Sequence, residues 1–296
     1  MWDRRPRYRR GERVGQRTAT TARQRRLGTE LRKMRERAGM SVVEAGQLLG
    51  VNRTRISNIE AARFGVSEDR IRTLATIYSC MDRAYVDALV VMNEERVHGW
   101  WEDYRGKTPA NALDLAELEH HAVAMRSAQI MHVPGLLQTE DYAKAVFSTT
   151  TSSPTPTQLR ASISYRLRRR DVLDRDDPPQ CTFLIHEAAL RMEFGGPKVM
   201  RAQLEQLIES SQRGNVTVRV VPFSAGGFSS PGMSTLYAFG PVRQLDTVQA
   251  DTPSGVAFLD TEAHLERYGS ILDQMEALAL SPEATSDLIR DIAQRL

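Results

Sequence analysis

The chain has 296 residues, enough for about two domains, and its 41% hydrophobic content is that of a globular protein. It contains no run of about 18 or more apolar residues, which excludes a transmembrane helix, and its arginine-rich start lacks the apolar segment of a secretory signal. The chain has only two cysteines, Cys80 and Cys181, which excludes a cysteine zinc finger and is typical of a protein in a reducing cytoplasm. We expect both cysteines to be buried as small hydrophobic side chains.

Charge is distributed unevenly along the chain. Of its 40 Lys and Arg and 37 Asp and Glu residues, 17 and 6 respectively lie within residues 1–66. This segment therefore carries a net charge of +11, and the remainder carries −8. The asymmetry indicates that the N-terminal part meets a polyanion, which the rest would repel.

Residues 1–26 contain ten arginines and almost no aliphatic side chains. Such a segment buries too little apolar surface to offset its ordering entropy, so we expect a disordered arm in the absence of DNA. Two interpretations are equally supported. The arm contacts phosphates or a minor groove, or it is a dispensable tail or an early translation start.

The stretch 41–60, SVVEAGQLLGVNRTRISNIE, predicts two short helices joined by a tight turn. It follows a first helix expected over 29–38. Ser41 and Glu44 form a capping box pattern, and Gly50 ends the helix because it enters the left-handed conformation cheaply. We expect an apolar stripe on this helix, made by Val43, Leu48 and Leu49.

The second of these helices begins at its N-cap Asn52 and is anchored from below by Ile56 and Ile59. Gly46 stands where the two helices cross. Side chains able to bond base edges face outward: Asn52, Arg53, Thr54, Ser57 and Asn58. The alternative is an ordinary helical hairpin with a solvated face, which the small residue, glycine turn and paired isoleucines at these spacings disfavour.

Residues 31–78, LRKMRERAGMSVVEAGQLLGVNRTRISNIEAARFGVSEDRIRTLATIY, resemble the helix-turn-helix domain of XRE (phage-repressor, Cro-type) transcriptional regulators. The resemblance implies an ion pair between Arg35 and Glu60, which ties the first helix to the end of the recognition helix. It also implies a recognition helix in the major groove of double-stranded DNA. We expect phosphate contacts from Ser41, Arg55 and Arg63. One motif covers only a half-site, so we expect a homodimer.

Two further helices, over 67–78 and 82–93, complete the predicted DNA-binding domain, which we place at residues 27–95. From residue 96 the character of the sequence changes, and we assign 96–296 to a sensor or partner-binding domain. Trp100 and Trp101 lie at this junction, where we expect them to pack the two domains together.

The C-terminal part predicts strands mixed with helices. We expect helices over 113–126, from the cap Thr139, and over 158–174, 198–210, 260–279 and 282–295. We expect strands over 181–187, 216–223, 233–239 and 247–251. The basic run on the 158–174 helix fits a solvated or ion-paired face better than a DNA contact. The fold class is therefore mainly α, with an α+β C-terminal domain in which helices cover a small mixed sheet.

This part, over about residues 98–295, resembles the C-terminal domain of actinomycete regulators of the WhiJ type, most specifically in PGLLQT. The resemblance implies a small neighbouring protein as partner and developmental or antibiotic regulation. We expect either that partner or a small-molecule effector at the PGLLQT turn and the 223–232 loop. The candidate residues are Pro134, Gly135, Leu136, Leu137, Gln138, Phe223 and Phe228. An antitoxin-like protein that autoregulates its own operon is a third interpretation.

Catalysis has little support in the sequence. The six histidines form no HExxH motif, and no Walker loop, GxGxxG or GxSxG occurs. His120 and His121 are adjacent and should point to different sides of a helix, while His186 and Glu187 end a strand. We therefore expect no enzyme, no metal and no cofactor. The predicted protein is a DNA-binding regulator in the cytoplasm, associated with the nucleoid, that represses by occupying a promoter.

Overall fold

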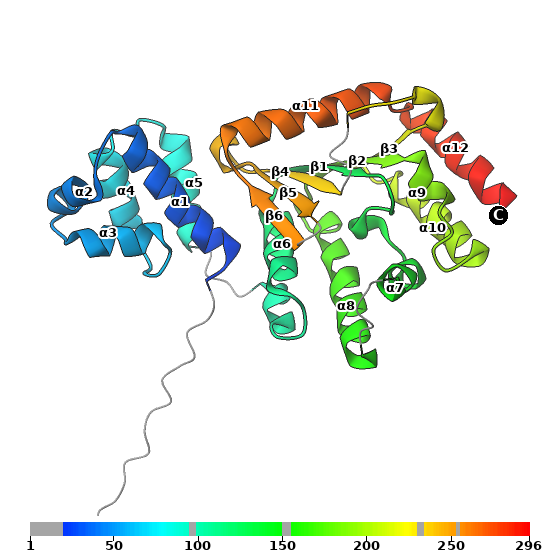
Figure 1. Cartoon of the computed structure of the whole chain (residues 1–296), viewed down its shortest axis with the longest axis horizontal. Helices are drawn as coiled ribbons and strands as arrows, with labels where there is room; N and C mark the ends of the chain where they lie inside the picture. The colour runs from blue at the N-terminus through cyan, green and yellow to red at the C-terminus, as the bar shows by residue number, and fades with distance from the viewer. Residues whose placement is uncertain (1–19, 95–98, 150–154, 230–233, 253–254) are drawn as a thin grey trace, which may run out of the picture.

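The computed structural model describes residues 20–94, 99–149, 155–229, 234–252 and 255–296. It consists of a helical N-terminal body and a larger body built on one sheet (Figure 1). The sequence predicted this fold class. Within the described residues, every helix is too short or too polar to span a membrane.

Five helices form the N-terminal body: α1 (Ala22–Arg37), α2 (Val42–Leu49), α3 (Arg53–Glu60), α4 (Glu68–Ile77) and α5 (Arg83–Glu94). Their shared core contains Leu31, Ile56, Ile71, Leu74 and Leu89, each at most 1% exposed. α1 begins seven residues before the predicted helix. The last part of the predicted arm is therefore helical, and residues 1–19 lie outside the described residues.

The C-terminal body is built on a six-stranded mixed sheet in the order β3-β2-β1-β4-β5-β6. β1 (Ala124–Gln129), β2 (Gln180–His186) and β3 (Val216–Val221) are parallel. β4 (Thr235–Phe239), β5 (Thr247–Thr252) and β6 (Gly255–Leu259) continue the sheet in antiparallel pairing. Crossover helices join the parallel strands, since such strands cannot be connected by a hairpin.

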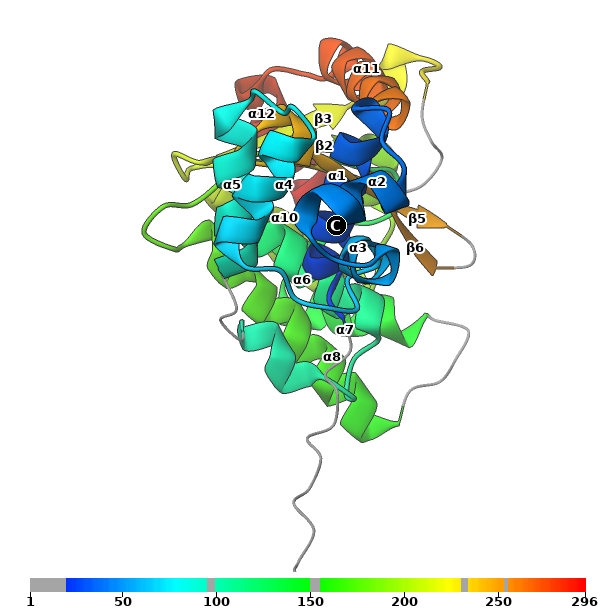
Figure 2. The ribbon, with the colours of Figure 1, turned by 90° about the vertical axis from the view of Figure 1, so that its left-hand side faces the viewer.

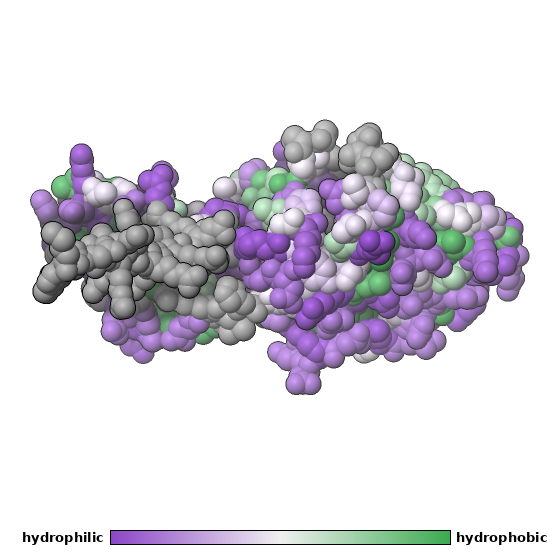
Figure 3. Space-filling model, turned by 90° about the horizontal axis from the view of Figure 1, so that it is seen from below, coloured by the Kyte–Doolittle hydropathy of each residue, from purple (hydrophilic) through white to green (hydrophobic). Residues whose placement is uncertain are grey.

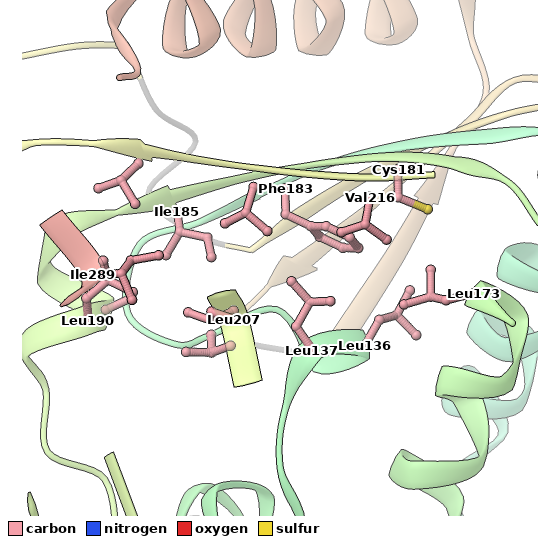
Figure 4. Close-up of a cluster of buried hydrophobic side chains, with 14 of the residues drawn as sticks. Leu136, Leu137, Leu173, Cys181, Phe183, Ile185, Leu190, Leu207, Val216 and Ile289 are labelled. Atoms are coloured by element: carbon pink, nitrogen blue, oxygen red, sulfur yellow. The ribbon is translucent and has the colours of Figure 1, made fainter. Parts of the chain in front are cut away.

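Helices cover both faces of the sheet. One face packs on α7 (Glu140–Ser148), α10 (Pro197–Ser210) and α12 (Pro282–Arg295), through the apolar cluster drawn in Figure 4. α11 (Glu262–Leu278) lies along the opposite face (Figure 1). The remaining helices are α6 (Ala110–His121), α8 (Pro156–Arg168) and α9 (Glu187–Arg191), with 3-10 turns η1 (Trp100–Tyr104), η2 (Gly135–Leu137), η3 (Arg169–Leu173), η4 (Phe223–Ala225) and η5 (Arg243–Leu245).

α1 holds the two bodies together through polar contacts. Nη2 of Arg26 donates to the carbonyl oxygens of Gln244 (2.7 Å) and Asp246 (3.1 Å), and Nη1 to the hydroxyl of Thr247 (2.9 Å). Arg25 pairs with Asp114 on α6 at 2.7 Å. The basic end of the chain therefore meets acidic and carbonyl groups of its own C-terminal body.

Trp100 and Trp101 lie elsewhere than predicted. Both pack inside the C-terminal body, where Trp101 joins Leu113 and Tyr165 in a small cluster of η1, α6 and α8. The prediction that they join the domains was wrong, because side chains of α1 already occupy that junction.

The strands differ from the prediction in several places. Residues 124–126, predicted to end a helix, belong to β1, which lies inside the sheet between β2 and β4. Arg126 in this strand pairs with Asp273 (2.7 Å) and Glu276 (2.8 Å) of α11. β6 was not predicted at all. The predicted strand 233–239 begins at Thr235, and Met233 lies outside the described residues.

Candidate DNA-binding surface

Caps set the geometry of the turn between α2 and α3. Ser41 accepts from the Glu44 N–H (3.2 Å), and Glu44 accepts from the Ser41 N–H (2.8 Å), so the capping box is complete. Gly50 ends α2 at φ +70°. Oδ1 of Asn52 then accepts the Arg55 N–H (2.9 Å) and caps α3. Each cap satisfies a backbone group that helix ends otherwise leave unpaired.

Two glycines allow the helices of this domain to cross closely. A Cβ at Gly46 would lie 2.8 Å from the carbonyl oxygen of Val51, so α2 reaches α3 only with glycine there. A Cβ at Gly28 of α1 would lie 2.4 Å from the carbonyl oxygen of Glu60. The sequence predicted the helix crossing at Gly46 but not the one at Gly28. Gly28 lies within a helix, away from any helix end or turn, so its position gave no local signal of a close contact.

The apolar stripe predicted on α2 was partly wrong. Val43 is 47% exposed and Leu48 is 61% exposed, while Leu49 packs partly buried against the domain core. Ala45 and Gly46 are the buried residues of α2. Small side chains make the inner face because the helices approach so closely.

The underside of α3 is fixed to the domain core. Ile56 and Ile59 are 1% and 3% exposed. Arg35 of α1 donates from Nε and Nη2 to the two carboxylate oxygens of Glu60, at 2.6 and 2.9 Å. The hydrogen bond to Glu60 raises the pKa of Arg35, so this cation stays charged. α3 therefore has little freedom to rotate or shift against the domain core.

The outer face of α3 is polar and uncovered. The exposed side chains are Asn52, Arg53, Thr54 and Ser57, and Asn58 is partly exposed. Figure 2 shows α2 and α3 toward the viewer, with the sheet and its helices behind them. Donors and acceptors of these types match the base-edge pattern of the major groove.

The residues expected at phosphates surround this face. Ser41 and Arg63 are exposed, and Arg55 is partly exposed with its guanidinium 4.8 Å from the centre of the Phe64 ring. Both Ser41 contacts in the capping box are made to Glu44, whose pKa the Ser41 hydrogen bonds lower. A carboxylate thus stands beside Ser41, whereas Arg55 and Arg63 carry positive charge.

Two family models match the chain. A helix-turn-helix domain matches residues 26–89, and the domain of unknown function DUF5753 matches residues 112–291, more than half of the chain. The chain belongs to the DUF5753 family. No curated protein and no solved structure matches it. The helix-turn-helix match covers most of α1, all of α2 to α4 and most of α5, so the surface described above lies in the matched helix-turn-helix domain.

The DUF5753 match runs from within α6 to within α12 and includes the whole sheet and the PGLLQT segment. Pro134, Leu136, Leu137 and Gln138 are buried, and Gly135 is partly buried. All except Leu137 line a cavity of about 530 Å³ on the α6 and α8 side of the sheet. The segment is therefore a cavity wall, and a partner protein docking on the molecular surface would not reach these side chains.

The structure separates Phe223 and Phe228 from that cavity. Phe228 packs with α11 on the opposite face of the sheet, and Phe223 is 55% exposed. Both rings lie against His186, at 5.1 Å for Phe223 and 5.5 Å for Phe228 between centroids. The structure therefore does not bring PGLLQT and the two phenylalanines of the 223–232 loop together in one cavity, and residues 230–233 lie outside the described residues.

His120, His121 and His186 make packing or helix-capping contacts. The His120 and His121 rings lie 4.9 Å apart and both contact Trp101, contrary to the expectation that they point apart. His186 caps α9 by accepting the Ala188 N–H (3.2 Å). Among the described residues, no group of three or more His, Cys, Asp or Glu side chains is placed to hold a metal ion.

Proposed function

We propose that this protein is a sequence-specific transcriptional regulator of the XRE type that binds double-stranded DNA as a homodimer. α3 lies in the major groove, with Asn52, Arg53, Thr54, Ser57 and Asn58 as the base-reading residues. The observation that supports this most is the contrast between the two sides of α3. Its apolar side is pinned by Ile56, Ile59 and the Arg35–Glu60 pair, and its polar side is exposed.

Phosphate contacts come from Arg55 and Arg63, with Ser41 at the start of α2. The arm that contacts DNA in this proposal is residues 1–19, because Arg25 and Arg26 already bind Asp114 and the β4–β5 turn. Its seven arginines supply the sequence-independent, salt-dependent part of binding.

Repression by occupying a promoter is the simplest mechanism for such a protein in the nucleoid. The DNA-binding domain extends to residue 95, and the WhiJ-type domain from residue 96 onward senses a signal. The buried position of PGLLQT beside a cavity favours a small-molecule effector over a small partner protein as that signal.

Genome-wide mapping of bound sites tests the proposal. The native chain should enrich a shared inverted repeat whose half-sites are about one helical turn apart, since a two-fold dimer presents two copies of α3. The Arg53→Ala variant should lose these sites, and Arg37→Ala, an exposed arginine on α1, should keep them. Binding without any shared sequence would contradict the proposal, and falling transcription on deletion of the gene would contradict repression.

A further inference from the structure

The cavity in the DUF5753 domain has the size and lining of a ligand site. Its volume of about 530 Å³ lies within the range of roughly 300–1,000 Å³ that small-molecule pockets occupy. One face of the sheet, α6, α8 and the PGLLQT segment enclose it. Its apolar wall includes Leu115, Val146 and Leu236. Figure 3 shows the side of this body on which α6 and α8 lie, with small hydrophobic patches among the hydrophilic side chains.

Arg166 of α8 brings a positive charge into this cavity without a carboxylate partner. Its Nη1 donates to Oε1 of Gln138 at 2.6 Å, and its guanidinium lies 4.9 Å from the centre of the Phe147 ring. In the described part of the chain its Nε is buried with no acceptor. No ion pair of Arg166 is formed among these residues, where Glu119 is paired with Arg169, and the charges of Glu119 and Asp251 act on Arg166 only from a greater distance. Burial, and then the charge of Arg169, lower the pKa of Arg166 to about 10.

The neighbouring Arg169 also lines the cavity, but its guanidinium forms an ion pair. It donates to both carboxylate oxygens of Glu119, at 2.8 and 2.5 Å, and both residues are buried. The charges of Arg169 and Glu119 neutralise each other, so Arg166 is the cation that remains to bind an anionic ligand. A planar guanidinium with several unused N–H groups suits the two oxygens of a carboxylate.

Gln138 holds the Arg166 side chain in position. It is 2% exposed, and its Nε2 donates to the carbonyl oxygen of Val133 at 2.8 Å. That bond orients Oε1 toward Arg166. The guanidinium is therefore preorganised at the cavity wall, which lowers the cost of binding an anion there.

The sheet contributes a side-chain amide and a carboxylate to the cavity wall. Gln249 and Asp251 of β5 also line the cavity, and Nε2 of Gln249 donates to Oδ1 of Asp251 at 2.9 Å. The Asp251 carboxylate offers further acceptor positions to a donor on the ligand. Two carboxylates in the lining, Glu119 and Asp251, disfavour a dianion such as a phosphate monoester.

We propose that this cavity binds a small organic carboxylate with an apolar body and a hydroxyl or amine group. The ligand carboxylate pairs with Arg166, the apolar body lies along Leu236 and Val146, and the hydroxyl or amine donates to Asp251. This site is separate from the DNA-binding surface of α3.

β5 connects the proposed ligand site with the DNA-binding domain. Thr247 at one end of the strand accepts a hydrogen bond from Arg26 of α1, while Gln249 and Asp251 of the same strand line the cavity. Control of DNA binding by the ligand rests on the proposed function. Binding of the ligand itself does not, so it is measured on the full chain without DNA.

Isothermal titration calorimetry with matched acids and amides tests the site. The acids are 4-hydroxyphenylacetate, 6-hydroxyhexanoate and 6-aminohexanoate, each compared with its own amide. At least one acid should bind one to one and exceed its amide in affinity by roughly ten- to hundredfold, as expected for a charge-assisted hydrogen-bonded pair. If none binds, or if acids and amides bind equally, the proposal is overturned.

Arg166→Gln should reduce the affinity of that acid to that of its amide. Arg160→Gln, which changes an exposed arginine earlier on α8, is the matched control and should leave the affinity unchanged. Removing an unpaired cation should leave the melting temperature of the unliganded chain no lower than the native value. A second variant, Asp251→Asn, should weaken 6-aminohexanoate more than 6-hydroxyhexanoate. Unchanged acid affinity in both variants would overturn the proposal.

Discussion

Arg35 of α1 donates one hydrogen bond to each carboxylate oxygen of Glu60, the last residue of α3. The two side chains are only 8% and 9% exposed. The end of α3 is therefore bound to α1, and the other end of α1 binds the sheet through Arg26. α1 therefore contacts both bodies, and Leu245 of the C-terminal body also packs into the core of the N-terminal body.

Arg35→Ala should destabilise the N-terminal body by about 3–5 kcal/mol, because it leaves the Glu60 carboxylate buried without its partner. Urea unfolding followed by circular dichroism measures the change. The double variant Arg35→Met, Glu60→Leu should recover much of the loss, since it removes both charges. Arg32→Ala is the control because Arg32 pairs with Glu36 on the exposed surface of the same helix. Equal losses for Arg32→Ala and Arg35→Ala would contradict this account.

Gly28→Ala should destabilise the domain by about 1–3 kcal/mol, because the new methyl group would press on the Glu60 carbonyl 2.4 Å away. Gly269→Ala in α11 is the matched control, since its nearest neighbour, Cε2 of Tyr237, is 3.9 Å away. Alanine at that site should be neutral or stabilise the helix by up to about 1 kcal/mol. Thermal unfolding of both variants gives the comparison, and a neutral Gly28→Ala would show that α1 and α3 do not cross so closely.

Arg26→Met should loosen the attachment of the N-terminal body to the sheet. Besides its bonds to the β4–β5 turn, the guanidinium pairs with Glu30 at 2.7 Å and with Asp260 at 3.2 Å. Hydrogen exchange should quicken at the start of α1 and over residues 243–247, because these backbones lose a shared anchor. Arg37→Met, exposed on the same helix, should change neither segment. Unaltered exchange in Arg26→Met would mean that other contacts hold the bodies together.

Local signals made the helix-turn-helix motif predictable. Ser41, Gly50 and Asn52 act through their own backbone neighbourhood, so the bounds of α2 and α3 could be read from the chain. The identities of the exposed polar residues on α3 also followed, because a helix whose Ile56 and Ile59 are buried has only one other face.

Features that depend on distant partners were not predictable in this way. Arg126 was predicted to end a helix, and only the pairing of its backbone with β2 at Thr182 and with β4 at Tyr237, both distant in the sequence, makes it a strand residue. Arg166 appeared as one of several arginines in RLRRR, with no local sign that it enters a cavity while Arg168 stays exposed. The tryptophan pair was assigned to the wrong interface because burial of an aromatic ring does not identify its neighbours.

His121 should make stability depend on pH. Burial first, and then the charge of Arg23, lower the pKa of this imidazole from 6.5 to about 3. A depressed pKa means that the unfolded chain takes up the proton first, so the contribution is present above pH 6.5 and is lost as the pH falls toward about 3. The slope is at most about 1.4 kcal/mol per pH unit.

Unfolding of the native chain and of His121→Gln across this pH window measures that contribution. The variant should lose stability less steeply as the pH falls. His264→Gln, an exposed histidine on α11, should follow the native curve. Parallel curves for the native chain and His121→Gln would contradict the buried, neutral state of this side chain.

Base recognition by α3 is tested most directly by comparing the native chain with Arg53→Ala on every single-base variant of a selected operator. Arg53→Ala should lose about 1–3 kcal/mol of binding free energy on the preferred sequence and should discriminate less at one position in each half-site. Arg63→Ala should instead weaken binding to all variants alike, because a phosphate contact carries no sequence information. An Arg53→Ala chain with native affinity and native discrimination would show that α3 does not read the bases.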